Sequence, residues 1–275
     1  MPRPPVSQRP FLQGTWPLAF AHRGGSLLWP ENTMAAFRGA VEMGYRYLET
    51  DLHATRDGAL ALIHDDTLER TTDGRGPVWE HTLAELKRFD AGYHFSPDGG
   101  RTYPYRGQDV TVPTLEEALE AFPEVRINVE IKQEQPPAVG AVAEFIERRG
   151  CQERLLVASF RDRVVKEFRR RSGGRVATSA AQREAFRFWL ASRLRLERFL
   201  RVPYDALQVP ARYGALTIVD RRFVEAAHNR GLQVHVWTVD EPAEMRRLLE
   251  LGVDGLMSDR PDLLLEVVGG RQPSS

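Results

Sequence analysis

This sequence contains little cysteine and little lysine, and neither sign of charge is in excess. A single cysteine, Cys151, among 275 residues excludes an internal disulfide framework and any metal cluster built on several cysteines. Thirty-eight basic residues balance thirty-eight acidic ones, so the composition lacks a basic footprint for nucleic acid, and we expect no nucleic-acid partner. Only Lys87, Lys132 and Lys166 are lysines among the basic residues, which makes each of them a mild clue to a specific role.

Long hydrophobic runs are also missing. The sequence contains no stretch of about 18 apolar residues, which is what a membrane-spanning helix needs. The first sixteen residues, MPRPPVSQRPFLQGTW, have no apolar core of a secretion signal. We therefore expect a cytoplasmic protein. Its 42% hydrophobic and 28% charged residues are ordinary for a globular protein, and we expect residues 1–275 to form a single domain.

Short apolar runs alternate along the chain with helical patterns. Eight strands that alternate with helices within about 250 residues are typical of the α/β class and of its (β/α)8 (TIM) barrel. A doubly wound sheet is the main alternative, but the strand count and the polar residues at the strand ends favour the barrel. The first helix should have Asn32 as its N-cap and should end at Gly44. The predicted strands are 17–22, 46–51, 126–131, 155–159, 175–180, 206–209, 233–238 and 254–257, and the predicted helices are 33–43, 114–121, 138–149, 161–171, 182–200, 220–230 and 241–251.

About fifty extra residues, 54–110, separate the second predicted strand from its helix. The segment starts as a hairpin, HATRDGALALIHD, with Asp57-Gly58 at the turn, and one short helix is expected near 82–89. Loops that follow barrel strands lie on the catalytic face. We therefore expect a hairpin-plus-cap insertion that covers a substrate, in preference to a second domain.

Acidic residues interrupt two of the apolar strands. Glu49 and Asp51 in LETDLH share one face of the second strand because strand side chains alternate, and Glu130 in NVEIK lies on the next strand. Three carboxylates brought together would repel one another unless a cation lies among them. Oxygen ligands suit Mg²⁺, Ca²⁺ or Mn²⁺, so the pattern favours one divalent cation. The alternative is that Glu49 pairs with an arginine and Glu130 faces water.

Two histidines fall close to these acids. His22 ends the first predicted strand, and His64 ends the return arm of the hairpin, which folds back near Glu49. Two imidazoles beside a cation bound by carboxylates can act as general acid and base. For either histidine taken alone, a hydrogen-bonded packing role is the usual alternative.

Two cationic side chains extend the candidate site toward an anion. Arg23 follows His22 directly and precedes Gly24-Gly25, which lets the backbone turn sharply and approach a ligand. A guanidinium suits the paired oxygens of a phosphate, and Lys132 adds a point charge on the same strand face as Glu130. The combination indicates attack on a P–O bond.

A series of segments resembles the glycerophosphodiester phosphodiesterase family. They are AHRGG…PENTMAAF, ETDLHATRDG, LIHDDTLERTTDG, PTLEEAL, NVEIK, SF, VHVWTVD and GVDGLMSDRPD, in the family's order from about residue 19 to 264. The resemblance implies a metal-dependent (β/α)8 barrel with an insertion after strand 2, which hydrolyses glycerophosphodiesters to glycerol 3-phosphate and an alcohol. It also implies a role for each candidate: His22 and His64 as acid and base, Glu49, Asp51 and Glu130 as metal ligands, and Arg23 and Lys132 as phosphate ligands.

Apolar features leave the substrate class open. Trp237 in VHVWTVD is either an aromatic wall for the substrate, which the resemblance supports, or part of the barrel core. The loop 27–29 and the basic amphipathic helix 182–200 indicate an acyl chain and peripheral contact with an anionic membrane. A lysophospholipase D acting on lysophospholipids is therefore the alternative function. For the helix, the other interpretation is an outer barrel helix with its arginines in solvent.

Two hypotheses from other functional classes are also open. A non-catalytic binder of phosphodiesters would be expected to lack one of the motif histidines or acids, and all of them are present. A metal-dependent aldolase or isomerase barrel would use Lys132 to form a Schiff base, but the two histidines and Arg23 fit phosphodiester cleavage better.

Overall fold

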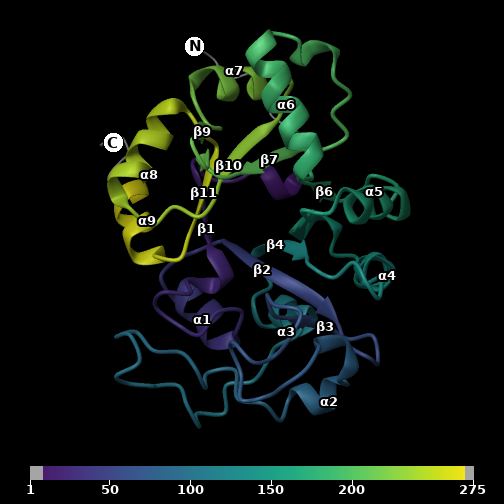
Figure 1. Ribbon diagram of the computed structural model, residues 1–275, viewed down its shortest axis with the longest axis vertical. Coiled ribbons are helices and arrows are strands. Elements are labelled where there is room, and N and C mark those ends of the chain that lie inside the picture. The colour runs from purple at the N-terminus through teal and green to yellow at the C-terminus, as the bar shows by residue number, and fades with distance from the viewer. Residues whose placement is uncertain (1–8, 270–275) are drawn as a thin grey trace.

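The computed structural model describes residues 9–269 and shows a barrel of parallel strands surrounded by helices (Figure 1). The barrel strands follow the order β6-β5-β4-β2-β1-β11-β10-β7. A parallel bridge between Ser179 and Ala206 joins the two ends of this order, so the predicted (β/α)8 barrel is confirmed. The absence of a secretion signal is a prediction about residues 1–16, of which 1–8 lie outside the described residues.

All eight predicted barrel strands are present, with ends that shift by a few residues. An additional strand, β3 (Leu60–Leu62), runs antiparallel to β2 and forms the predicted hairpin. The barrel strands are β1 (Leu18–Ala21), β2 (Tyr47–Ala54), β4 (Arg126–Ile131), β5 (Leu155–Ala158), β6 (Ala177–Thr178), β7 (Ala206–Val209), β10 (Gln233–Val236) and β11 (Gly255–Ser258).

Helices cover the outside of the barrel (Figure 1). Across residues 9–269, no helix combines the length and the apolar character that crossing a membrane requires. The α-helices are α1 (Met34–Glu42), α2 (Leu83–Leu86), α3 (Leu115–Ala121), α4 (Val139–Arg149), α5 (Asp162–Arg171), α6 (Gln182–Leu194), α7 (Arg221–Asn229), α8 (Pro242–Leu251) and α9 (Pro261–Gly269).

Strand register determines which side chains meet inside the barrel. β2 is buried along its whole length, and β4 lies beside it with Glu49 opposite Asn128 and Asp51 opposite Glu130. These four residues share the inner face because side chains alternate along a strand. Leu48, one position along, belongs instead to the large apolar core. The register therefore brings acids from two strands to one place.

The amino-terminal end of the barrel is closed by the first described residues. A 3-10 turn, η1 (Pro10–Leu12), buries Phe11 and Leu12 in one cluster with Phe20 and Tyr47. The barrel thus has an apolar plug at one end, and the polar residues that follow the strands gather at the other, which is where active sites of this architecture lie.

Helix α6 is shorter than the predicted helix 182–200. It ends at Leu194 because Arg195 adopts a left-handed conformation with φ of 58°, and a 3-10 turn, η5 (Glu197–Phe199), follows. In that turn Glu197 is buried and pairs with Arg222 of α7 at 2.9 Å. The apolar pattern continues past residue 194 and therefore does not reveal the break.

The insertion after β2 has a small apolar cluster of its own, which includes Ile63, Leu68 and Val78. The helix predicted near 82–89 is the single-turn α2, which begins with a capping box between Thr82 and Glu85. The pairing of β3 with β2 attaches the insertion to the barrel.

A second hairpin, which the sequence does not predict, follows β7. β8 (Arg212–Tyr213) pairs with β9 (Leu216–Thr217) in antiparallel orientation. Strands of two residues are too short to show the alternation on which strand prediction depends.

Candidate active site

Three carboxylates meet where β2 and β4 lie side by side. One oxygen from each of Glu49, Asp51 and Glu130 lies within 4.8 Å of the other two. Glu49 and Asp51 are 3% and 1% exposed. The three predicted metal ligands therefore come together, in a geometry that one hard cation could bridge through oxygen ligands.

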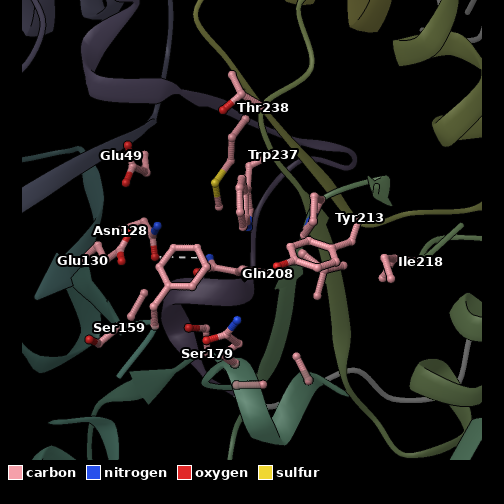
Figure 2. A pocket seen from close by; sticks show the side chains of 18 of the residues that line it. Glu49, Asn128, Glu130, Ser159, Ser179, Gln208, Tyr213, Ile218, Trp237 and Thr238 are labelled. Carbon is pink, nitrogen blue, oxygen red and sulfur yellow. Dashed lines mark hydrogen bonds between the residues drawn. The ribbon is translucent and has the colours of Figure 1, made fainter. Parts of the chain in front are cut away.

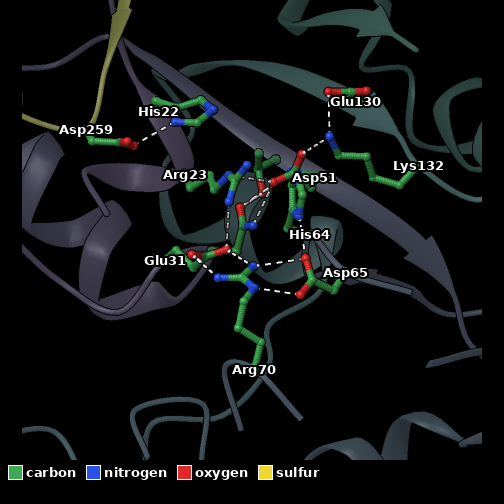
Figure 3. A network of polar contacts seen from close by, with 12 residues as sticks. His22, Arg23, Glu31, Asp51, His64, Asp65, Arg70, Glu130, Lys132 and Asp259 are labelled. Carbon is green, nitrogen blue, oxygen red and sulfur yellow. Dashed lines mark hydrogen bonds and ion pairs between the residues drawn. The ribbon is translucent and has the colours of Figure 1, made fainter. Parts of the chain in front are cut away.

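Two cationic side chains lie against the same acids (Figure 3). Lys132 Nζ is 2.8 Å from Glu130 and 3.1 Å from Asp51, and Arg23 Nε is 3.1 Å from Asp51. Burial alone would raise the pKa of Asp51, but Lys132 and Arg23 hold that pKa below its usual value. Burial raises the pKa of Glu49 and of Glu130. The two glutamates therefore lack part of the positive charge that their ionised forms need.

His22 stands at the end of β1 between two carboxylates. Its Nδ1 lies 2.7 Å from Asp259 Oδ1, and its Nε2 lies 3.7 Å from Glu49 Oε2. A carboxylate can only accept, so Nδ1 carries a proton. Burial alone would lower the pKa of His22, but the negative charges of Glu49 and Asp259 outweigh it and raise this pKa to about 9. These two carboxylates therefore favour the imidazolium form of His22.

His64 has a carboxylate partner of its own on the far side of the acids. Its Nδ1 lies 2.6 Å from Asp65 Oδ1, and Arg70 Nε donates to the other oxygen of Asp65 at 2.6 Å. Arg70 also donates two hydrogen bonds of 2.7 Å to Glu31, which accepts a third from Arg23 at 3.0 Å. Charged hydrogen bonds thus link the surroundings of His64 to Arg23 (Figure 3).

The turn after β1 places Arg23 through unusual backbone geometry. Arg23 has a φ of 50°, and its N–H donates to Glu49 Oε2 at 3.1 Å. Gly24 follows with a φ of 82°, and a Cβ at this position would lie 2.7 Å from the Cβ of Ala36. Glycine is thus the residue that lets the turn lie against α1.

Asn32 belongs to the site and does not cap α1 as predicted. The N-cap is Thr33, whose hydroxyl accepts from the N–H of Ala36 at 3.2 Å. Asn32 has a φ of 55°; its Nδ2 donates to Asp51 at 3.0 Å, and its Oδ1 accepts from the Thr50 hydroxyl at 2.7 Å. A sequence pattern shows that a capping residue is near, but not which of two adjacent polar residues turns toward the acids.

These groups surround a cavity of 630 Å³ at the carboxyl ends of the strands. One end of the lining is polar, and Asp51 lies just behind it. The other end is apolar and comes from α6 and the β8–β9 hairpin (Figure 2). Of the predicted site residues, those that line the cavity are His22, Arg23, Glu49, His64, Glu130, Lys132 and Trp237.

Two amides that the sequence does not single out, Asn128 and Gln208, also line the cavity. Gln208 Nε2 donates to Asn128 Oδ1 at 3.2 Å (Figure 2) and lies 3.3 Å from His235 Nδ1. Burial lowers the pKa of His235 to about 3, so this imidazole is neutral. Its Nε2 donates to Gln233 Oε1 at 2.8 Å, which leaves Nδ1 to accept from Gln208. The buried histidine thereby fixes the Gln208 amide.

Trp237 forms one wall of the cavity. Its ring meets that of Phe160 edge to face, with centroids 5.4 Å apart, and both residues line the cavity. Trp237 also packs against the apolar cluster inside the barrel. Trp237 therefore lines the cavity and also packs against the barrel core.

The apolar loop 27–29 contacts α1. Among the described residues that line the cavity, none comes from this loop. Trp29 lies against Gly39 of α1 so closely that a Cβ there would come within 2.5 Å of its ring. The apolar end of the cavity is thus built from other segments.

Four charged residues that form hydrogen bonds around His22, His64 and Arg23 are missing from the sequence prediction. They are Asp259, Asp65, Glu31 and Arg70. Asp259 directly follows β11, so the same strand-end rule that selects His22 would have found it. Asp65 is adjacent to His64. Glu31 and Arg70 lie in loops 39 residues apart, and no periodicity connects them.

Known proteins resemble this chain over nearly its whole length. Residues 22–263 match the glycerophosphoryl diester phosphodiesterase family. A probable glycerophosphodiester phosphodiesterase 2 of Mycobacterium tuberculosis is 36% identical over 267 residues, which cover 95% of this chain and 94% of that protein. An Oleispira antarctica phosphodiesterase, whose structure is a complex with the product sn-glycerol-3-phosphate, is 26% identical with a TM-score of 0.72, covering 92% of this chain and 97% of that one.

The barrel itself is also similar to a more distant solved structure. The glycerophosphoryl diester phosphodiesterase domain of an uncharacterized Mycobacterium tuberculosis protein superposes with a TM-score of 0.82 at 23% identity. The match covers 93% of this chain and 99% of that domain, and at this identity it supports the fold.

Proposed function

This chain belongs to the glycerophosphoryl diester phosphodiesterase family and is a phosphodiesterase, and we propose that it hydrolyses glycerophosphodiesters with two histidines and one divalent cation. The products are glycerol 3-phosphate and an alcohol. One observation carries the proposal: His22 and His64, each with Nδ1 against a carboxylate, line the same cavity as Glu49 and Glu130.

Glu49, Asp51 and Glu130 would hold the cation. Their oxygens match the ligand preference of Mg²⁺, Ca²⁺ or Mn²⁺, and the raised pKa of Glu49 and of Glu130 indicates a need for positive charge at this place. When bound, a cation polarises the phosphoryl oxygens and stabilises the negative charge that develops on them.

The two histidines have different roles in the proposed reaction. His22, whose two neighbouring carboxylates favour its protonated form, donates its Nε2 proton to the leaving alkoxide oxygen. His64 accepts the proton of the attacking hydroxyl, which belongs to water or to the substrate. In both rings Nδ1 is tied to a carboxylate, so Nε2 is the atom that exchanges the proton.

Arg23 and Lys132 are proposed to bind the phosphate oxygens. Both line the cavity, and both are held by acids: Arg23 by Glu31 at 3.0 Å and Lys132 by Glu130 at 2.8 Å. Side chains that are already fixed lose little freedom when the substrate arrives. Trp237 would form the wall beside the glycerol group.

The charge state of Lys132 argues against the aldolase hypothesis. Burial alone would lower the pKa of this amine, but Asp51 and Glu130 outweigh it and raise the pKa above its usual value. An amine that forms a Schiff base must be neutral. The surroundings of Lys132 therefore support the binding of an anion.

We propose that the insertion 54–110 is part of the barrel domain. Its β3 strand pairs with β2, and the segments that follow place His64 in the cavity lining and Arg70 against Glu31. Its contribution to the described cavity lining is His64, so its main role would be to support the site.

A lysophospholipase D activity is the second candidate. The cavity extends from the acids to an apolar end lined by Phe186, Trp189 and Leu216. A deacylated glycerophosphodiester has no apolar group to place there, whereas the acyl chain of a lysophospholipid would fill it.

A substrate panel with controlled metal content tests the proposal. Glycerophosphocholine and lysophosphatidylcholine are assayed after EDTA treatment and again after Mg²⁺, Ca²⁺ or Mn²⁺ is added. We expect chelation to abolish the release of glycerol 3-phosphate and at least one metal to restore it. Glu49→Gln should resist restoration, while Glu42→Gln on the exposed end of α1 should behave as wild type. Full activity in EDTA would contradict the carboxylate site.

A further inference from the structure

We propose that residues 182–201, which include α6 and η5, and the β8–β9 hairpin together form a docking surface for an anionic phospholipid bilayer. The docking surface would bring the mouth of the cavity to the lipid. The proposal rests on the proposed function, because docking would place a phosphodiesterase beside the phosphodiester groups of the lipids. The surface itself is argued from the exposure, charge and contacts of its residues.

Exposed large apolar side chains are concentrated on the docking surface. Seven of the ten such side chains within residues 9–269 lie there, with exposed fractions between 45% and 69%. An apolar area of this kind marks a place of interaction on a protein surface. The seven are Phe186, Leu190, Leu194, Leu196, Phe199, Tyr213 and Leu216.

Helix α6 has two apolar faces. Its inner face buries Phe188 and Ala191 against the rest of the protein. Its outer face, which in a helix that only covers a barrel would be polar, repeats large apolar residues at every fourth position, Phe186, Leu190 and Leu194. Arg187 lies on this outer face and is exposed. Apolar residues flanked by arginines are typical of a helix that lies in a lipid interface.

The charges of the segment 182–201 favour an anionic partner. Its two acids are engaged with arginines of other elements, Glu184 with Arg169 at 2.7 Å and Glu197 with Arg222 at 2.9 Å. The remaining arginines can bind lipid phosphates, because guanidinium groups match phosphate oxygens. Within residues 9–269, those of the segment that form no ion pair are Arg183, Arg187, Arg195, Arg198 and Arg201.

The hairpin is fixed to α6, so that the two elements form one surface. Trp189 Nε1 donates to the carbonyl oxygen of Thr217 at 3.3 Å, and Arg193 donates to that of Ile218 at the same distance. Tyr213 and Leu216 are exposed and also line the cavity. The docking surface and the cavity lining therefore share side chains, of which Figure 2 shows Tyr213.

A bilayer fits this surface better than a second copy of the chain. In a symmetric dimer through the docking surface, the arginines without ion pairs would face those of the partner copy and repel them. An anionic lipid interface supplies phosphates for the arginines and an apolar layer for the phenylalanine and leucine side chains. It also presents phosphodiesters at the mouth of the cavity.

Vesicle flotation of the full chain tests the proposal. We expect binding to vesicles of equal parts phosphatidylglycerol and phosphatidylcholine, weaker binding at high salt, and little binding to phosphatidylcholine alone. Arg187→Glu/Arg198→Glu and Leu194→Ser/Phe199→Ser should each lower the affinity by about tenfold or more. The matched controls Arg38→Glu/Arg46→Glu and Leu27→Ser change exposed residues elsewhere and should bind as wild type.

Turnover of water-soluble glycerophosphocholine is measured on the same samples. The docking variants should retain it, since none of these residues lines the cavity. Absence of vesicle binding with intact turnover would overturn the docking proposal alone, and binding without turnover would overturn the proposed function alone. An equal loss of vesicle binding in the control variants would overturn docking through this surface. The docking proposal would also be overturned if the wild type formed a dimer that the docking substitutions disrupt. It would be overturned as well if an acidic protein bound this surface in place of lipid.

Discussion

His22 Nδ1 lies 2.7 Å from a carboxylate oxygen of Asp259, and this contact joins the end of β1 to the residue after β11, 237 positions along the chain. The two strands are neighbours in the barrel, so closure of the sheet creates the contact. It fixes the proton on Nδ1, leaves Nε2 for the substrate, and stabilises the imidazolium.

Asp259→Asn should therefore move the pH dependence of the reaction. The proposed acid is the imidazolium of His22, so activity falls as pH rises through the pKa of His22. Asp259 raises that pKa, and its replacement by an amide should shift the alkaline limb of the kcat/KM profile to lower pH. We also expect kcat to fall by roughly tenfold to a hundredfold. Asp262→Asn, a nearby acid paired with Arg260, is the control, and an unmoved limb in Asp259→Asn would contradict the assignment.

His22→Ala and His64→Ala should each reduce kcat by at least about a hundredfold, which is the usual scale of general acid–base catalysis. The fold should be retained, because both side chains border the cavity and neither belongs to the apolar core. Turnover is measured together with far-UV circular dichroism and the thermal midpoint. His94→Ala, on an exposed residue of the insertion, is the control. Near wild-type turnover in either active-site variant would reject the proposed pair.

Asn32 should contribute to stability as well as to the site. Asn32→Ala removes the hydrogen bond to the buried carboxylate of Asp51 and puts alanine, which tolerates left-handed backbone less well than asparagine, at a φ of 55°. Together these should lower the free energy of unfolding by about 2–4 kcal/mol. Asn32→Gly loses the same hydrogen bond, but glycine adopts left-handed backbone without strain. The free energy of unfolding should therefore fall less in this variant. Urea denaturation measures both, and an Asn32→Ala variant as stable as wild type would contradict this account.

The barrel strands and the acids could be predicted because the information is local. Each strand is a short apolar run, and alternation places Glu49 and Asp51 on one face without knowledge of the rest of the chain. His22 and Glu130 follow from their positions at strand ends. The motif resemblance then adds roles that spacing alone leaves open, and these roles are proposals that the variants above test.

The supporting residues could not be predicted in the same way. Glu31 and Arg70 meet only when two irregular loops fold against each other, and loops have no periodicity to read. The choice between Asn32 and Thr33 as cap depends on which side chain turns toward Asp51. The break at Arg195 is a backbone feature inside a continuous apolar pattern, and β8–β9 is too short to detect.

The apolar end of the cavity should decide between the two substrate classes. Phe186→Ser and Leu216→Ser remove exposed apolar side chains that line it, and a side chain of this size contributes about 1.5–3 kcal/mol when an acyl chain buries it fully. For a short-chain lysophosphatidylcholine below its micelle concentration, kcat/KM should therefore fall by about tenfold or more, while glycerophosphocholine should be hydrolysed as before. Leu190→Ser is the matched control, because Leu190 belongs to the docking surface but does not line the cavity. A wild-type enzyme that hydrolyses only the deacylated diester would exclude the acyl-chain interpretation of this end of the cavity.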